Sequence, residues 1–250
     1  MSRVSHESPR LRRARRRLKN PGCASFSVIR RGRSGRRRHA TSGPLFNEAC
    51  GAVYDGAVNA RKQPGRVRII GGQWRSRVLD VADVPGLRPS GSRVRETLFN
   101  WLTPHLPGAR VLDAFAGTGA VGSEALPRGA SQAVLVERDA AAVAALKRNA
   151  KALDANCEVR QADARTLLGA ANPGRPFDIV FLDPPFAAGD ALRLCTLSAD
   201  NGWLAPGGRL YLEQPAAVTV EPGPPLEPIR EKTAGQVRFA LYALAEGAQQ

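Results

Sequence analysis

Residues 111–119 read VLDAFAGTG, a short apolar run that ends in an aspartate and a glycine-rich turn. An apolar strand followed at once by glycines is typical of the first strand–turn–helix unit of a nucleotide-binding sheet, where backbone must approach a ligand closely. Residues 117–122 match the pattern G-x-G-x-x-G, and Glu137 follows 20 residues after Gly117. A carboxylate at that distance is well placed to accept hydrogen bonds from ribose hydroxyls. The same pattern would also suit NAD, or a turn that only packs a helix on a strand.

Strand-like and helix-like segments alternate around this turn. We predict strands at residues 110–114, 133–137, 157–160, 178–182, 208–213 and 236–243, and helices at residues 120–126, 140–153 and 190–197. Such alternation predicts an α/β fold in which a mostly parallel sheet carries helices on both faces.

A small extension precedes the alternating region. Residues 67–70 and 75–79 flank two glycines and predict a hairpin. From Ser92 to the prolines after Leu102, apolar residues recur at helical spacing and predict a helix, whose outer face carries Arg93 and Arg95. We therefore divide the chain into a tail (1–63), a hairpin and helix extension (64–104) and a main domain (105–250).

The net charge of +15 is concentrated in the tail. Residues 1–63 hold 16 Lys and Arg against three Asp and Glu, whereas residues 64–250 hold 21 against 19. A segment so basic and so poor in apolar residues is predicted to be disordered. It would serve as an arm that binds polyanions such as RNA, or it would be dispensable.

The remaining composition excludes several classes of protein. The four cysteines, at positions 23, 50, 157 and 195, lack the paired spacing of a zinc site or a disulfide framework, which favours free thiols. No segment approaches the roughly 20 apolar residues of a transmembrane helix, and the start of the chain lacks the apolar core of a signal peptide. We predict a cytoplasmic protein that needs neither a metal nor a membrane.

Residues 183–186 read DPPF and follow the apolar run 177–182. The Asp183 carboxylate and the Pro184 carbonyl can each accept an N–H of a flat, amine-bearing ring, while Pro185 restricts the backbone and Phe186 offers a stacking face. Such a clamp favours methyl transfer to an exocyclic amine, although Asp and Pro are also common in plain turns.

Two further carboxylates favour S-adenosylmethionine over NAD. Asp113, before the glycine turn, could bind a cationic amino-acid group, whereas a pyrophosphate would be repelled there. Asp163 is a candidate acceptor for the adenine amino group. Each of the two could instead cap the turn or helix that follows it.

With these motifs in place, residues 66–244 resemble the RsmD family of bacterial 16S rRNA guanine-N2 methyltransferases. The matching stretches are residues 66–75 (RVRIIGGQWR), 87–89 (LRP), 93–102 (RVRETLFNWL), 115–120 (FAGTGA), 183–186 (DPPF), 201–204 (NGWL) and 235–237 (GQV). The first and third are far more specific than the glycine turn. Residues 90–92 (SGS) and Pro127 depart from the family pattern, and the basic tail has no counterpart in it.

The resemblance implies a seven-stranded, Rossmann-like class I fold that transfers a methyl group from S-adenosyl-L-methionine to N2 of one guanine, guanine 966 by family convention. It implies, as substrate, 16S rRNA in an assembling 30S subunit with ribosomal proteins bound; we expect a monomer. The implied cofactor residues are Asp113, Phe115, Ala116, Gly117, Gly119, Glu137 and Asp163, and the implied catalytic residues are Asp183, Pro184, Pro185 and Phe186. The arginines expected to face RNA are Arg75, Arg77, Arg88, Arg93 and Arg95, unless they are merely solvated or paired within the domain.

Two other functions fit part of this pattern. The same clamp would act on adenine N6 or on a glutamine side chain, and the clamp alone does not rank guanine above adenine. A catalytically silent RNA-binding or assembly protein is the alternative from another class, but such a protein would not need Asp113, Glu137 and Asp183 together.

Overall fold

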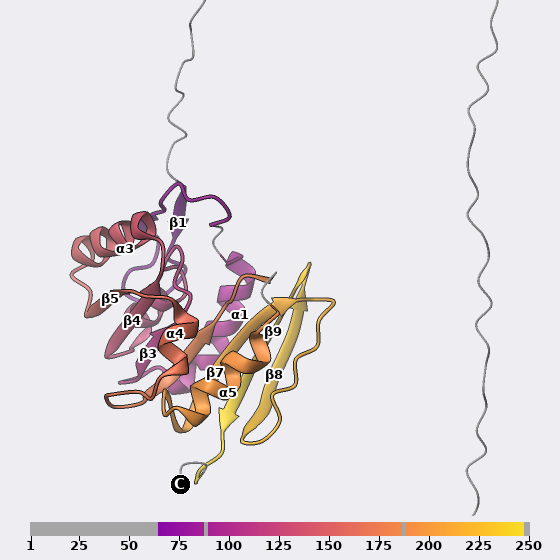
Figure 1. Cartoon of the computed structure of the whole chain (residues 1–250). Coiled ribbons are helices and arrows are strands. Elements are labelled where there is room, and N and C mark those ends of the chain that lie inside the picture. The colour runs from indigo at the N-terminus through magenta and orange to yellow at the C-terminus, as the bar shows by residue number, and fades with distance from the viewer. Residues whose placement is uncertain (1–64, 88–89, 187–188, 248–250) are drawn as a thin grey trace, which may run out of the picture. The chain divides into compact units, whose positions relative to one another are not determined.

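The central strands of the sheet are apolar on both faces, as expected for strands covered by helices on each side. A computed structural model describes residues 65–87, 90–186 and 189–247 (Figure 1). The strands of the main sheet are β3 (Arg110–Asp113), β4 (Gln132–Glu137), β5 (Cys157–Gln161), β6 (Phe177–Leu182), β7 (Leu204–Pro215), β8 (Leu226–Ala234) and β9 (Val237–Leu244). The expectations for the tail and for Arg88 lie outside the described residues.

The sheet has the order β5-β4-β3-β6-β7-β9-β8. The pairs from β5 to β7 are parallel, and β9 runs antiparallel to both β7 and β8. The chain winds outward from β3 in both directions, so the ends of β3 and β6 meet where the strand order reverses. In such sheets ligands bind outside the carboxyl ends of the strands at this point.

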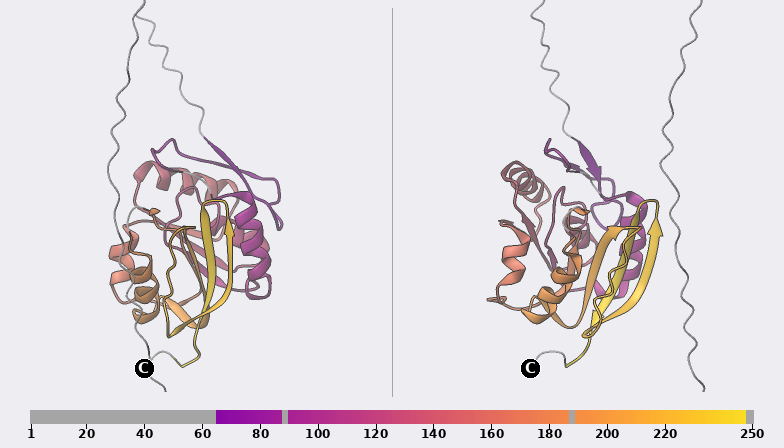
Figure 2. Two further views of the ribbon diagram at one scale, coloured as in Figure 1. Left: turned by 90° about the vertical axis from the view of Figure 1, so that its right-hand side faces the viewer. Right: turned by 45° about the vertical axis from the view of Figure 1, so that its right-hand side comes forward.

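Helices cover both faces of the sheet (Figure 2). They are α1 (Ser92–Leu102), α2 (Gly122–Ala125), α3 (Ala140–Ala152), α4 (Ala164–Gly169) and α5 (Ala191–Asp200), with short 3-10 turns at Thr103–His105 and Leu126–Arg128. Side chains of α1, α2 and α3 share one core cluster with β3 and β6, while α4 and α5 share the cluster on the other face. The predicted α/β sheet with helices on both faces is therefore confirmed.

The extension is a two-stranded hairpin of β1 (Arg66–Arg68) and β2 (Val78–Asp80) followed by α1. Val67 and Leu79 face each other across the hairpin and pack with Ala120 of the main domain. Asn149 of α3 fixes the edge of β2, since its side chain accepts a hydrogen bond from Asp80 N (3.1 Å) and donates one to Asp80 O (2.9 Å). The predicted hairpin is confirmed, with shorter strands than expected.

Two elements differ from the sequence prediction. β8 was not predicted, because eight of its nine residues are exposed or half-buried and no apolar alternation marks it. The helix after the glycine turn has only one α-helical turn and continues as a 3-10 turn through Pro127, whose ring cannot follow on in an α-helix. No helix of the described ranges is long and apolar enough to cross a membrane.

Candidate active site

A cavity of about 750 Å³ opens at the carboxyl ends of the parallel strands. Its walls come from the segment before α1, the glycine turn after β3, the end of β4 and the start of α4. The segment after β6, the last part of β7 and the start of β9 complete them. The predicted residues that line it are Phe115, Gly117, Glu137, Asp163, Asp183, Pro184, Pro185 and Phe186. The motifs predicted to bind the cofactor and to act in catalysis, about 70 residues apart in the sequence, thus meet in one cavity.

Glycine is required in the turn after β3 for both space and backbone conformation. Gly117 and Gly119 have φ of 51° and 75°, values that other residues rarely adopt. A Cβ on Gly119 would lie 2.5 Å from Leu146 Cδ2, and one on Gly122 would lie 2.3 Å from Leu135 Cδ2. Ala116 is buried and its N–H donates to Val136 O at 2.9 Å, so it anchors the turn to β4 without lining the cavity.

Asp113 lies behind the glycine turn, where its carboxylate is buried. Its carboxylate accepts a hydrogen bond from Gly122 N at 2.9 Å, is 3% exposed and does not line the cavity. Burial raises the pKa of Asp113 to about 7, against the effect of the Gly122 N–H. The side chain therefore ties β3 to the start of α2, as the capping alternative requires, and its role in cofactor binding stays a prediction.

Glu137 and Asp163 lie on the cavity wall and hold the backbone around it. Glu137 accepts from Gly117 N at 3.0 Å and from Asp139 N at 2.9 Å. Asp163 caps α4 by accepting from the backbone N–H groups of Thr166 and Arg165, which lower its pKa. Because a carboxylate has about four acceptor positions, each of these two side chains can still accept hydrogen bonds from a ligand.

The Asp183–Phe186 segment continues β6 into the cavity. Asp183 is half-buried and accepts a long hydrogen bond of 3.4 Å from Ser90 Oγ, and burial raises its pKa to about 6. Pro184 is buried, whereas the ring of Phe186 is 47% exposed. The step from a half-buried carboxylate to an exposed ring is suited to a flat ligand that enters from solvent.

Glu213 is a cavity residue that the sequence analysis missed. It follows Leu212 on β7, and Leu212 pairs with Leu182 of β6, so Glu213 and Asp183 follow neighbouring positions on adjacent parallel strands. Glu213 is 5% exposed and accepts a hydrogen bond from Tyr211 Oη at 2.9 Å. Burial first, and then the charge of Asp183, raise its pKa to about 8. In the sequence, Glu213 could have been noticed as a carboxylate at the end of a predicted strand. Only the strand order shows that this strand end lies beside Asp183.

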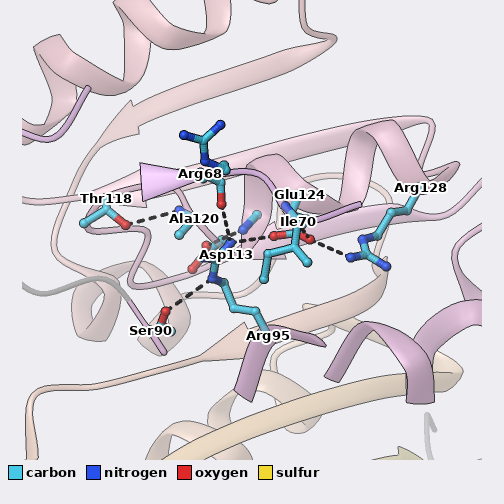
Figure 3. Close-up of polar contacts among 10 residues, drawn as sticks. Arg68, Ile70, Ser90, Arg95, Asp113, Thr118, Ala120, Glu124 and Arg128 are labelled. Carbon is cyan, nitrogen blue, oxygen red and sulfur yellow. Dashed lines mark hydrogen bonds and ion pairs between the residues drawn. The ribbon is translucent and has the colours of Figure 1, made fainter. Parts of the chain in front are cut away.

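The predicted RNA-facing arginines separate into two groups. Arg75, Arg77 and Arg93 are exposed. Arg95 is a correction, because it is 4% exposed and its Nη1 lies 2.6 Å from Glu124 Oε2 (Figure 3). It also donates to the carbonyls of Ser90 and Arg68, both at 3.2 Å. The predicted outer face was wrong here because positions 95, 98, 99 and 102 form the stripe that α1 buries.

No cluster of metal-ligating side chains is found among the residues that the structure describes.

The fold is that of a class I S-adenosylmethionine-dependent methyltransferase. It has a carboxylate after the glycine turn and an Asp-Pro-Pro-Phe segment at the strand where the strand order reverses. Comparison with known proteins narrows this class. The family model described as "Conserved hypothetical protein 95" matches residues 67–243.

Several curated relatives carry the name Ribosomal RNA small subunit methyltransferase D, and two of them show the range of similarity. The Escherichia coli protein is 49% identical over 71% of this chain and 90% of its own length, and the Haemophilus influenzae protein is 40% identical over 71% and 94%. A solved structure of yhhF, a methyltransferase candidate from Escherichia coli, superposes with a TM-score of 0.66 at 46% identity, over 73% of this chain and 99% of that one. The chain belongs to this RsmD family, as its sequence motifs predicted.

Proposed function

We propose that this chain transfers a methyl group from S-adenosylmethionine to the exocyclic N2 amine of a guanine in 16S rRNA of the small ribosomal subunit. One observation carries the proposal: the Asp183–Phe186 segment, the glycine turn and Glu137 line a single cavity. Membership of a family whose curated relatives are named small-subunit rRNA methyltransferases supports the choice of substrate.

The residues of the cavity fit the cofactor. A ligand can approach the backbone of the turn closely because Gly117 carries no side chain. The space there is narrow, since a Cβ on Gly117 would lie 3.1 Å from Leu87 Cδ1. Glu137 would accept from the ribose hydroxyls and Asp163 from the adenine amino group, while Phe115 and the backbone of Gly117 would flank the ligand. When bound, S-adenosylmethionine would supply an electrophilic methyl group on a sulfonium, and the neutral thioether that keeps the S–C electron pair would be the leaving group.

The clamp holds the accepting nitrogen. The lone pair of an aromatic amine is delocalised into the ring, so the nitrogen must be made pyramidal before it can attack. Asp183 and the Pro184 carbonyl would each accept one N–H and leave the lone pair free on the third side. Phe186 would stack on the base, a contact worth about 1–3 kcal/mol. Holding reactants in this way contributes roughly 7–11 kcal/mol to lowering a barrier of this kind.

Two of the carboxyl groups that line the cavity, those of Asp183 and Glu213, differ in their ionisation at pH 7. With a pKa of about 6, Asp183 is mostly ionised at pH 7 and can accept hydrogen bonds and then the proton that N2 loses. Glu213, with a pKa of about 8, is mostly neutral at pH 7, so it adds little repulsion to the charge of Asp183. Tyr211 keeps the Glu213 carboxyl in place.

The target base must leave its stack to enter the cavity, which costs least where it is unpaired. We propose that the chain acts as a monomer on an assembling 30S particle with ribosomal proteins bound, and that Arg75, Arg77 and Arg93 contact RNA. Their exposure on the hairpin and on α1 supports this assignment.

The test is methyl transfer from labelled S-adenosylmethionine to undermodified 30S particles, naked 16S rRNA and DNA, followed by mapping of the methylated nucleoside. We expect N2-methylguanosine from the 30S particle. Label in N6-methyladenine, or no label on any substrate while the cofactor still binds, would contradict the proposal.

A further inference from the structure

A second cavity, of about 510 Å³, lies beside the first and shares Ser90 and Gly91 with it. It is bounded by β1, by the turn of the hairpin and by the start of α1. We call it the hairpin groove. Because the two cavities share one rim, a polymer whose base enters the first would lie across the opening of the second.

The hairpin groove is lined by cations. β1 buries Val67 and turns Arg66 and Arg68 to the exposed side, about 6.6 Å apart along the strand. Arg75 reaches the same groove from the hairpin turn. The Arg68 side chain is oriented by the hydrogen bond that its Nη1 donates to Ser76 O at 3.0 Å. None of the described residues that line the groove is Asp or Glu. Asp80 pairs with Arg66 in the hairpin register but does not line the groove.

The fourth arginine of the groove has a different role. Arg95 lies on its floor, but the charge of Arg95 is balanced by Glu124 in the interior. Its hydrogen bonds to Arg68 O and Ser90 O join the strand that carries the exposed arginines to the rim of the catalytic cavity. These hydrogen bonds hold the strand that carries Arg66 and Arg68 next to Ser90. Because Ser90 also contacts Asp183, the position of the exposed arginines relative to Asp183 is set.

We propose that the hairpin groove binds the phosphodiester backbone next to the target nucleotide, with Arg66, Arg68 and Arg75 as the phosphate contacts. This inference rests on the proposed function, because it takes the ligand of the first cavity to be a base on an RNA strand. Phosphates are favoured as ligands because the described residues that line the groove offer guanidinium groups and polar backbone, and none of them is an aromatic side chain on which a base could stack. Arg66 and Arg68 become RNA contacts that the sequence did not single out.

The experiment measures the affinity of the full chain for a fluorescent single-stranded RNA between 50 and 200 mM salt. The variants are Arg66→Gln with Arg68→Gln, and Arg75→Gln alone. Each phosphate contact that is lost should reduce the slope of log K against log salt by about 0.7. Arg175→Gln is the matched control, because Arg175 is exposed but precedes the first residue of β6, whereas Asp183 follows its last residue. The basic tail is present in every variant, so its share of the slope cancels.

We expect the groove variants to bind RNA more weakly and to show a smaller slope of log K against log salt. They should bind S-adenosylmethionine as before, and on 30S particles they should give the same methylated nucleoside with a lower kcat/KM. An unchanged slope, or an equal loss in Arg175→Gln, would overturn the groove assignment and leave the proposed function standing. If the groove variants instead lose binding to a polyglutamate peptide while their RNA affinity stays intact, the groove assignment is overturned in favour of an acidic protein partner. If the wild-type chain methylates no guanine while the groove variants still lose RNA affinity, the proposed reaction fails and the groove stands.

Discussion

Arg95 and Glu124 form an ion pair of 2.6 Å whose side chains are 5% and 0% exposed. Glu124 also accepts from Arg128 at 2.6 Å and from the backbone N–H of Ile70 at 3.2 Å (Figure 3). The carboxylate belongs to α2, directly after the glycine turn, and its partners come from the hairpin segment, α1 and the 3-10 turn. One buried charge thus joins the extension to the cofactor turn, and Arg95 continues the connection to Ser90 on the catalytic cavity.

We predict that Glu124→Gln lowers the free energy of unfolding by roughly 3–5 kcal/mol, because it leaves the buried Arg95 guanidinium without its carboxylate. Urea denaturation monitored by tryptophan fluorescence measures the change. Glu158→Gln is the control, since Glu158 pairs with Arg160 at the same 2.6 Å with side chains 48% and 37% exposed. That variant should lose less than about 1 kcal/mol. Equal losses in the two variants would show that burial does not decide the effect.

Gly119→Ala should destabilise the protein more than Gly108→Ala. Both glycines have φ of 75°, so both variants carry the same backbone strain of roughly 1 kcal/mol. Only at Gly119 would the new Cβ meet a neighbour, Leu146 Cδ2 at 2.5 Å, whereas nothing lies within 4 Å at Gly108. Displacing Leu146 should also distort the turn beneath the cofactor. Thermal unfolding and calorimetric titration with S-adenosylmethionine test both effects, and matching results for the two variants would contradict the steric argument.

Methyl transfer should depend on pH through Asp183. Its pKa of about 6 means that the accepting carboxylate is present above about pH 6 and is lost as the pH falls, so the single-turnover rate at saturating substrates should drop about tenfold per unit below that value. Asp183→Asn should be slow and independent of pH between 5 and 7. Asp183→Ala should abolish turnover with little change in cofactor affinity. Loss of cofactor binding in that variant would show that Asp183 is not a substrate clamp.

The sequence predicted the alternating sheet and the two motifs that meet in the cavity, because both depend on short-range patterns. Apolar runs mark β3 and β6, and glycines and prolines mark the turns that follow them. The failures came from side chains whose role depends on distant partners. Arg95 reads as a surface arginine until Glu124, 29 positions later, is placed beside it. Glu213 becomes a cavity residue only because β7 lies next to β6.

The raised pKa of Glu213 yields a prediction about stability. A carboxyl that binds its proton more tightly in the folded state stabilises the fold fully below its unfolded pKa, and that stabilisation is lost as the pH rises through the folded pKa of about 8. Glu213→Gln keeps an oxygen for the Tyr211 hydroxyl and cannot ionise. The free energy of unfolding of this variant, relative to wild type, should therefore increase between pH 5 and pH 8. Urea denaturation at three pH values measures it, with Glu227→Gln on the exposed side of β8 as the control. If the Glu213→Gln and wild-type curves run parallel, Glu213 is ionised in the folded protein, and Asp183 would have a second negative charge beside it.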